Sequence, residues 1–332
     1  MAALKHLLGH VCWAAGLLAA AGDRGIAAEI SAVAAPLSQL VAVTFNTGTP
    51  RCSRERNALY SCSAAEIAGE WYGTGLSFKV LVEKARVFFA GLKPDIVAFQ
   101  EMFPSDACGD IPPAYHPGFV CEDWRADDPS VVQQVLGPDY QIACNLGKAD
   151  KCLAVKKSLG HWRGCQTDLC LDHLAGAPVD GCGGGSRIGR GVVEMLDGGM
   201  LTVVNVHGTS GMTPTDQDCR RRQFQQVFVD LGDGLPAANG THNLILGDLN
   251  TDPGRMVLDS SVRLWNSHVG AGLAFHFLTD VGRNAEPTYA GLLNIDHVAS
   301  DWLQGGCLGV QVTDIVSFDH QAIVCTLHMP NQ

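Results

Sequence analysis

Six short apolar segments of the sequence each end on a side chain that can take part in acid–base or metal chemistry. They read LILGDLN with Asp248 and Asn250, VAVTFN with Asn46, DIVAFQE with Glu101, VVNVH with His207, NIDH with Asp296, and SFDH with His320. An apolar run of this length is typical of a buried strand, and a polar residue at its end lies where the strand emerges from the core. One such strand end is ordinary, but six in one chain indicate an active site.

Hydrolysis of a phosphodiester is the reaction that these residue types suit best. It requires a cation at the phosphoryl oxygens, a positioned water molecule and a proton source for the leaving oxygen. The expected cation is Mg²⁺ or Mn²⁺, which prefers oxygen ligands, and Glu101 suits this metal-binding role. Asp248 suits orienting or deprotonating the water, and the amide of Asn250 suits holding a phosphoryl oxygen.

Two histidines complete the expected catalytic set. His320 can hold the attacked phosphate, and a carboxylate such as Asp296 would fix the tautomer of its ring. His207 would supply a second imidazole as the proton donor to the leaving group. Taken singly, the motifs have simpler explanations: Asp248 and Asn250 can form a polar turn, and His207 can be a structural histidine. The presence of all the strings together favours the catalytic interpretation.

The elements that must position these residues can be predicted around each segment. Residues 40–45 predict a strand, 78–92 a helix ended by Lys93-Pro94, and 95–101 a second strand. A hairpin is expected from 191–195 and 201–206, followed by a helix at 217–231 and strands at 243–247, 293–299 and 321–327. Residues 102–186 show no regular pattern. We therefore expect one α+β domain over 36–332, with a cysteine-rich insertion at about 102–190.

The N-terminus has the layout of a secretory signal peptide. Lys5 precedes a short Leu- and Ala-rich stretch and then small residues, so we place the signal at 1–28, with cleavage between 22 and 35. A membrane anchor is the alternative, but the apolar stretch contains His10 and is shorter than the ~20 residues a spanning helix needs. Of 13 cysteines only Cys12 lies in this segment. Export predicts disulfides among the others, in a protein secreted to the periplasm or outside the cell.

The charge balance bears on the partners of the protein. A net charge of -11 argues against tight binding of nucleic acid through bulk electrostatics, although not against brief contact with a phosphodiester. One segment, 144–190, is locally basic. It holds Lys148, Lys151, Lys156, Lys157, Arg163, Arg187 and Arg190 against four aspartates. This segment can steer a polyanion, or it can be a solvated loop stapled by disulfides.

Together the six strings resemble the motifs of the endonuclease/exonuclease/phosphatase superfamily, over about residues 41–327. The resemblance implies a four-layer α/β sandwich, with two mixed sheets packed face to face and helices outside. It also implies roles: metal binding by Glu101, Asp319 and Asn46, and catalysis by His207, Asp248, Asn250, Asp296 and His320. One position departs from the pattern, because Phe318 stands where the family usually has Ser, with Ser317 one place earlier. That weakens any role for the serine.

The resemblance leaves the substrate open between two branches of the superfamily. A histidine at position 207 is what secreted deoxyribonucleases and sphingomyelinases use, and the basic segment favours a nuclease. The string QEMF resembles secreted sphingomyelinases, but Thr209 stands where they usually have Gln. A lipid enzyme would also need an exposed apolar loop, for which Leu264-Trp265 and 273–278 are the candidates. We favour an extracellular nuclease without an obligate protein partner, ahead of a sphingomyelinase-like phospholipid phosphodiesterase.

A different class of function is a secreted binding protein that keeps the fold without catalysis. Every expected catalytic position carries a competent residue, which disfavours it. The remaining polar residues have simple structural interpretations. We expect His268, His276, His297 and His328 to be structural or exposed, Asp252 to shape its loop, and Arg220 to Arg222 to form a solvated helix face.

Overall fold

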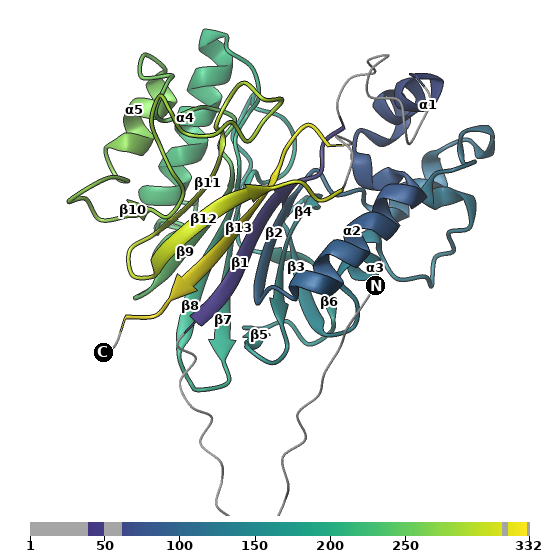
Figure 1. Ribbon diagram of the computed structural model, residues 1–332, viewed down its shortest axis with the longest axis horizontal. Coiled ribbons are helices and arrows are strands. Elements are labelled where there is room, and N and C mark those ends of the chain that lie inside the picture. The colour runs from purple at the N-terminus through teal and green to yellow at the C-terminus, as the bar shows by residue number, and fades with distance from the viewer. Residues whose placement is uncertain (1–38, 50–61, 314–317, 331–332) are drawn as a thin grey trace, which may run out of the picture. The chain divides into compact units, whose positions relative to one another are not determined.

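The computed structural model describes residues 39–49, 62–313 and 318–330 (Figure 1). Its strands are β1 (Gln39–Asn46), β2 (Ile96–Gln100), β3 (Tyr140–Asn145), β4 (Lys148–Lys156), β5 (Gly160–Trp162), β6 (Leu169–Leu174), β7 (Ile188–Met195), β8 (Met200–His207), β9 (Asn243–Asp248), β10 (His276–Phe277), β11 (Asp296–Ser300), β12 (Gln304–Val310) and β13 (Ala322–His328). Its α-helices are α1 (Cys62–Ile67), α2 (Lys79–Leu92), α3 (Val131–Leu136), α4 (Pro214–Phe228) and α5 (Ser260–Asn266). Short helical turns are η1 (Ala68–Tyr72), η2 (Gly75–Ser77), η3 (Ser105–Asp110), η4 (Pro113–Tyr115) and η5 (Val120–Glu122).

These strands form two mixed sheets. The seven-stranded sheet has the order β12-β13-β1-β2-β4-β3-β6, and the six-stranded sheet has the order β10-β11-β9-β8-β7-β5. In the first sheet β1 and β2 run parallel, and in the second β8 and β9 run parallel, while most of their neighbours are antiparallel. The predicted α+β fold class with two mixed sheets is confirmed.

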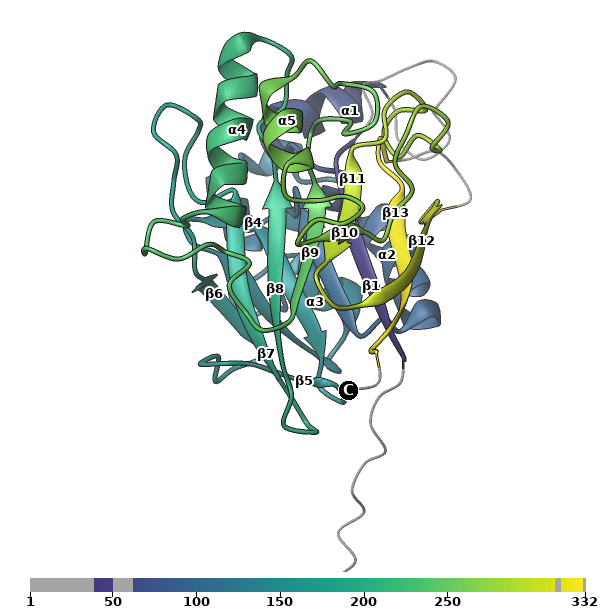
Figure 2. The same cartoon turned by 90° about the vertical axis from the view of Figure 1, so that its left-hand side faces the viewer.

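Three apolar cores separate four layers of secondary structure. The central core packs the inner faces of the two sheets together, with Leu40 of β1 and Leu246 of β9 among its members. A second core lies between the seven-stranded sheet and α2 and α3, and a third between the six-stranded sheet and α4 and α5. Figures 1 and 2 show these helices on the outer faces of the two sheets. Because both faces of β1, β2, β8 and β9 are covered, these strands are almost continuously apolar. Their apolar runs allowed them to be predicted from the sequence.

The segment that the sequence predicts to be irregular is instead built into both sheets. Residues 102–186 contain α3 and the strands β3, β4, β5 and β6, three of which extend the seven-stranded sheet. Five disulfides join cysteines of the described residues: Cys108–Cys121, Cys144–Cys152, Cys165–Cys170, Cys182–Cys219 and Cys307–Cys325. The cysteines 144 to 182, predicted to staple one loop, therefore form two local links and one link to α4.

Helix α4 corrects two sequence expectations. It spans Pro214–Phe228 instead of 217–231, because Thr213 caps it through a capping box with Asp216 and Pro214 occupies its first turn. Arg220 is fully buried and not part of a solvated face. Its guanidinium lies 2.6 Å from Asp259, which precedes α5, and donates to the carbonyl oxygens of Thr209 and Gly211. Arg220 thus ties α4 to α5 and to the loop after β8.

The expected signal peptide at 1–28 lies outside the described residues, so its prediction stands untested, as does the single domain over 36–332. Within the described part of the chain, none of the helices combines the length and the apolarity that crossing a membrane requires.

Candidate active site

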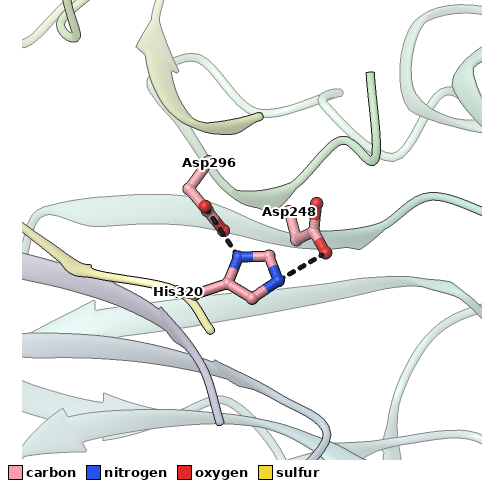
Figure 3. Close-up of side chains that lie close together, drawn as sticks. All are labelled: Asp248, Asp296 and His320. Carbon is pink, nitrogen blue, oxygen red and sulfur yellow. Dashed lines mark hydrogen bonds and ion pairs between the residues drawn. The ribbon is translucent and has the colours of Figure 1, made fainter. Parts of the chain in front are cut away.

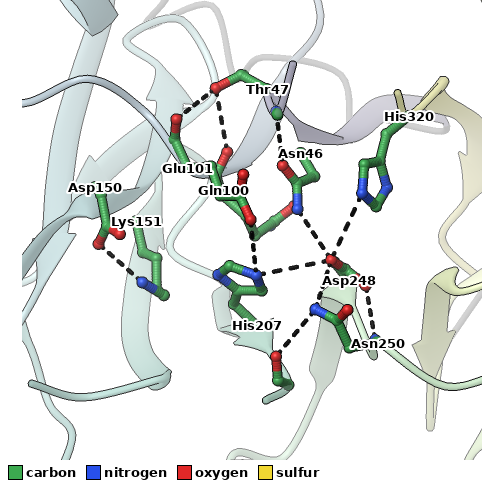
Figure 4. Close-up of polar contacts among 12 residues, drawn as sticks. Asn46, Thr47, Gln100, Glu101, Asp150, Lys151, His207, Asp248, Asn250 and His320 are labelled. Atoms are coloured by element: carbon green, nitrogen blue, oxygen red, sulfur yellow. Dashed lines mark hydrogen bonds and ion pairs between the residues drawn. The ribbon is translucent and has the colours of Figure 1, made fainter. Parts of the chain in front are cut away.

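The polar strand ends that the sequence singles out meet at one edge of the two packed sheets (Figure 4). Strand registers bring them there: Asn46 lies beside Gln100, the residue before Glu101, and Asp248 lies between His207 and Asp296. His320 lies two residues before β13, the antiparallel neighbour of β1. The structure therefore gathers all eight predicted site residues: Asn46, Glu101, His207, Asp248, Asn250, Asp296, Asp319 and His320.

Asp248 is the centre of this arrangement and is fully buried. Its Oδ2 accepts from Asn46 Nδ2 and Asn250 Nδ2, each at 2.9 Å, and its Oδ1 accepts from the Asn250 backbone N–H at 2.7 Å. Gly247 permits the close approach of β8, since a Cβ there would lie 1.9 Å from the Val206 carbonyl oxygen. Burial raises the pKa of Asp248 to about 7, against the nearby His320, which lowers it. The carboxyl thus titrates near neutrality, as a general base requires.

The expected role of Asn250 changes with this geometry. Its side-chain amide donates to Asp248 Oδ2 and also to the Gly208 carbonyl oxygen at 3.0 Å. Both N–H groups are therefore engaged, and holding a phosphoryl oxygen would require one of these bonds to break. Asn250 also has a positive φ of 51°, a conformation that costs free energy and that this network maintains. We assign Asn250 to orienting Asp248.

His320 forms an ion pair with Asp296 on one side and faces Asp248 on the other (Figure 3). Its Nδ1 lies 2.8 Å from Asp296 Oδ2, and its Nε2 lies 3.9 Å from Asp248 Oδ2. Burial alone would lower the pKa of His320, but the charge and hydrogen bond of Asp296 raise it to about 10. Thr288 holds Asp296 in place by donating from Oγ1 to Asp296 Oδ2 at 2.7 Å. At neutral pH His320 is thus an imidazolium with a fixed ring.

His207 stands on the opposite side of Asp248. Its Nε2 lies 3.4 Å from Glu101 Oε1 and 3.7 Å from Asp248 Oδ2, while its buried Nδ1 has no partner. Burial lowers the pKa of His207 to about 4, so the ring is neutral at pH 7. Burial would raise the pKa of Glu101, but the hydrogen bond from His207 and the positive charge of His320 lower it to about 2. Glu101 is therefore ionised and available as a ligand for a cation.

Three oxygen atoms converge on an open space above Gly48. A Cβ placed on Gly48 would lie 2.6 Å from Asp319 Oδ1, 2.9 Å from Glu101 Oε2 and 3.3 Å from Asn46 Oδ1. Asp319 Oδ1 is buried without a hydrogen-bond partner, and burial raises the pKa of this carboxyl. A hard divalent cation would resolve both features, because it binds oxygen ligands and favours ionised carboxylates. We call these three side chains the oxygen cradle, and they fit Mg²⁺ or Mn²⁺.

A second cluster has ligand-type atoms at close range but is less suited to a metal. The side chains of Asp248, Asp296 and His320 bring such atoms within 4.8 Å of one another. His320, however, carries a proton on Nδ1 for Asp296, and a protonated imidazole repels a cation. These residues therefore form a proton-holding network beside the oxygen cradle.

Several residues support the site without having been singled out in the sequence. Gln100 Nε2 donates to Asn205 Oδ1 at 2.8 Å, which links the two sheets directly beneath the site. Thr47 Oγ1 donates to the Glu101 carbonyl oxygen at 2.7 Å, where Glu101 has a positive φ of 58°. Asn205 and Gln100 stand inside the strings VVNVH and DIVAFQE, so their position within buried strands was an available signal. Thr47 and Thr288 offered none.

Other polar residues lie as the sequence predicts. His297 is buried between Thr279 and the Asn294 carbonyl oxygen and has a structural place. Asp252 accepts from Arg255 Nη1 at 2.8 Å and from the Asn294 backbone N–H at 3.1 Å, and so shapes the loop after β9. Phe318 packs edge-on against Phe45, and Ser317 lies outside the described residues.

Comparison with known proteins locates this fold. No protein-family profile matches the chain, and no curated protein matches it in sequence. Among solved structures, an endonuclease/exonuclease/phosphatase from Beutenbergia cavernae DSM 12333 is 14% identical with a TM-score of 0.51, over 88% of this chain and 72% of that chain. A functionally unknown conserved protein from Enterococcus faecalis V583 is 11% identical with a TM-score of 0.51, over 87% of this chain and 100% of that chain. The chain has the endonuclease/exonuclease/phosphatase fold, the one that its sequence motifs resemble.

Proposed function

We propose that the protein is a secreted, divalent-metal-dependent phosphodiesterase, and specifically an extracellular nuclease. The observation that carries this proposal is the edge of the sheets where an ionised carboxylate, a carboxyl with a pKa near 7, a neutral imidazole and an imidazolium surround one space. Phosphodiester hydrolysis uses a metal ligand, a base for the attacking water, a proton donor for the leaving oxygen and a positive charge at the phosphate, and these groups can supply them. The fold is compatible with the proposal, since the Beutenbergia cavernae protein that shares it is named an endonuclease/exonuclease/phosphatase.

The oxygen cradle is the proposed metal site, held by Glu101, Asp319 and Asn46. A bound Mg²⁺ or Mn²⁺ would supply positive charge to the phosphoryl oxygens. Asn46 uses its two side-chain atoms in different directions, because Nδ2 donates to Asp248 and Oδ1 accepts from the Gly48 N–H and faces the cradle. It thereby fixes the distance between the metal site and the general base.

Proton transfer is assigned to Asp248 and His207. Asp248 takes a proton from the attacking water, since its pKa lies near the working pH and Asn46 and Asn250 hold its carboxylate in place. His207 is neutral in the free protein, and the negative charge of a bound phosphate raises its pKa so that it can carry a proton. It then delivers this proton from Nε2 to the leaving oxygen. His320 remains an imidazolium and stabilises the charge that builds up on the phosphate.

Secretion is part of the proposal. Its supports are the signal-peptide layout of residues 1–28 and the five disulfides of the described residues. Disulfides of this number persist in oxidising compartments outside the cytosol.

The lipid alternative has less support from the described residues. Trp265, one of the candidates for membrane contact, is 1% exposed and packs edge-on against Phe224 and Phe228. In the other candidate segment, 273–278, Phe275 is buried and β10 is bonded to β11. Leu273 is the one large apolar side chain of these two segments that is exposed, so neither segment presents several apolar side chains to a bilayer. This leaves the nuclease as the preferred assignment.

The test compares two substrates with the oxidised protein lacking residues 1–28. Supercoiled plasmid and sphingomyelin vesicles are each incubated with Mg²⁺, with Mn²⁺ and with EDTA. We expect nicking of the plasmid that EDTA abolishes and no release of phosphocholine. Glu101→Gln should raise the Mg²⁺ concentration for half-maximal nicking, while the exposed Glu83→Gln should not. Nicking that persists in EDTA contradicts the metal role, and phosphocholine release with intact plasmid contradicts the nuclease assignment.

A further inference from the structure

An open pocket of about 490 Å³ lies on the His207 side of the active site and is lined by three cationic side chains. They are Lys148, Lys151 and Arg187, all from the segment that the sequence shows to be locally basic. Glu101 and His207 line the same pocket, so it is continuous with the proposed catalytic centre. Figure 4 shows Lys151 beside His207. We call these three residues the cationic wall.

Arg187 is placed by the backbone of β8. The His207 backbone N–H donates to the Arg187 carbonyl oxygen at 3.0 Å, which puts the two residues at adjacent strand ends. Arg187 Nη1 reaches the Gly208 carbonyl oxygen at 3.3 Å, but its Nε is buried without a partner. No carboxylate pairs with Arg187 among the described residues. A buried guanidinium donor without an acceptor is costly unless a ligand provides one.

Lys151 is 1% exposed and comes from β4, next to the strand that leads to Glu101. Its Nζ lies 2.8 Å from Asp150 Oδ1, while Lys148 Nζ lies 4.0 Å from the other oxygen of the same carboxylate. Burial and the charges of Lys148 and Arg187 lower the pKa of Lys151, to about 8, against the pull of Asp150. Asp150 is thus shared by two lysines, and the other carboxylate, Glu101, faces His207 and the oxygen cradle.

We propose that the cationic wall binds a phosphate of the substrate other than the one being cleaved. This inference rests on the proposed function and narrows it to a class of substrate. A pocket with surplus positive charge directly beside the leaving-group histidine suits a polymer with a phosphate at every unit, which is a nucleic acid strand. The headgroup of sphingomyelin carries one phosphate and a quaternary ammonium, so it would bring a cation to this wall.

Binding is the first test, because it does not depend on turnover. A fluorescein-labelled single-stranded DNA 12-mer is titrated by anisotropy in EDTA, using a His320→Ala background. We expect Lys148→Met and Arg187→Met each to weaken binding about 5- to 10-fold and to reduce the slope of log Kd against log salt by about 0.7. Arg163→Met is the matched control, since Arg163 is exposed and paired with Glu194 at 2.7 Å. Binding and salt slope unchanged from the parent in both wall variants would overturn the proposal.

Hydrolysis of two substrates then separates substrate binding from chemistry. Bis(p-nitrophenyl) phosphate has a single phosphodiester and no second phosphate, whereas the 12-mer has many. In the otherwise native protein with Mg²⁺, Arg187→Met should lower kcat/KM about 10-fold on the 12-mer and less than about 2-fold on the small diester. Equal losses on both substrates would show that Arg187 acts on the chemical step or the fold, and would overturn the subsite.

The two proposals fail in different ways. If the native protein with Mg²⁺ cleaves neither substrate while the wall variants still weaken 12-mer binding, the nuclease assignment fails and the phosphate subsite stands. If the native protein cleaves both substrates while the wall variants bind the 12-mer as tightly as the parent does, the subsite proposal fails and the phosphodiesterase assignment stands.

Discussion

The two active-site histidines lie at nearly the same distance from one carboxylate, yet His207 is neutral at pH 7 and His320 is positively charged. His207 Nε2 is 3.7 Å and His320 Nε2 is 3.9 Å from Asp248 Oδ2, and both rings are buried. The difference lies at the other nitrogen of each ring. Asp296 accepts from His320 Nδ1, while His207 Nδ1 has no partner. The hydrogen-bond partner at Nδ1 of each ring, and not the distance of the ring from Asp248, therefore sets the protonation state of the imidazole in this site.

The largest expected effect comes from removing the charged ring. His320→Ala should lower plasmid-nicking activity about 10⁴-fold, because the site loses the fixed positive charge of the His320 ring. His328→Ala is the matched control, since His328 is an exposed residue of the adjoining strand β13. Thermal unfolding should show that both variants fold. Near-normal turnover in His320→Ala would remove this residue from the mechanism.

Removing the neutral ring should cost less. His207→Ala is expected to lower kcat about 10²- to 10³-fold, the usual contribution of one general acid. A substrate with a good leaving group, such as a p-nitrophenyl diester, needs no proton at the leaving oxygen. The variant should therefore recover most of its activity on that substrate, while His320→Ala should not. Equal losses for both variants on both substrates would contradict the division of roles.

The pH profile tests the carboxylate that both rings face. Burial raises the pKa of Asp248 to about 7, and a general base must be ionised to accept a proton. On a p-nitrophenyl diester, which needs no proton from His207, kcat/KM should therefore fall about tenfold per pH unit below neutrality and level off above it. Because the pKa of His320 is about 10, its charge is kept throughout this range. A flat profile from pH 5 to 8 would exclude Asp248 as the base.

The smallest effect concerns the hydroxyl behind Asp296. Thr288→Val removes the hydrogen bond to Asp296 Oδ2, worth about 1 kcal/mol, so kcat/KM should fall about fivefold. Thr288→Ser retains the hydroxyl and should restore activity. The imidazole pKa of His320, followed by NMR, should shift in the valine variant and return in the serine variant. An unchanged pKa in Thr288→Val would show that Asp296 needs no such support.

The sequence predicted the parts of the molecule in which the pattern of apolar residues matches the burial of the segment in the fold. Strands such as β1, β2 and β9 are buried on both faces, so their apolar runs and polar ends marked the sheet edge directly. Strand β4 and the edge strand β6 of the seven-stranded sheet carry charged residues such as Lys151 and Asp172, and their pattern was read as irregular.

The residues that the sequence did not reveal depend on contacts between distant segments. Arg220 sits in a run of three arginines, and only the packing of α4 against α5 shows that it alone is buried beside Asp259. Lys151 and Arg187 were noted as basic residues, but their common pocket beside His207 depends on how the two sheets pack together. The start of α4 was readable, since Thr213, Pro214 and Asp216 form a recognisable capping signal.

Substitution of Gly48 alone could inactivate a protein with this active site. A single methyl group at this position would occupy the space where Asp319, Glu101 and Asn46 converge, and would displace the proposed metal without altering any of its ligands. A relative with alanine at position 48 would keep every catalytic residue and still be a silent enzyme. Surveys that identify active members from their catalytic residues alone would count it as active, so the residue at position 48 should be read first.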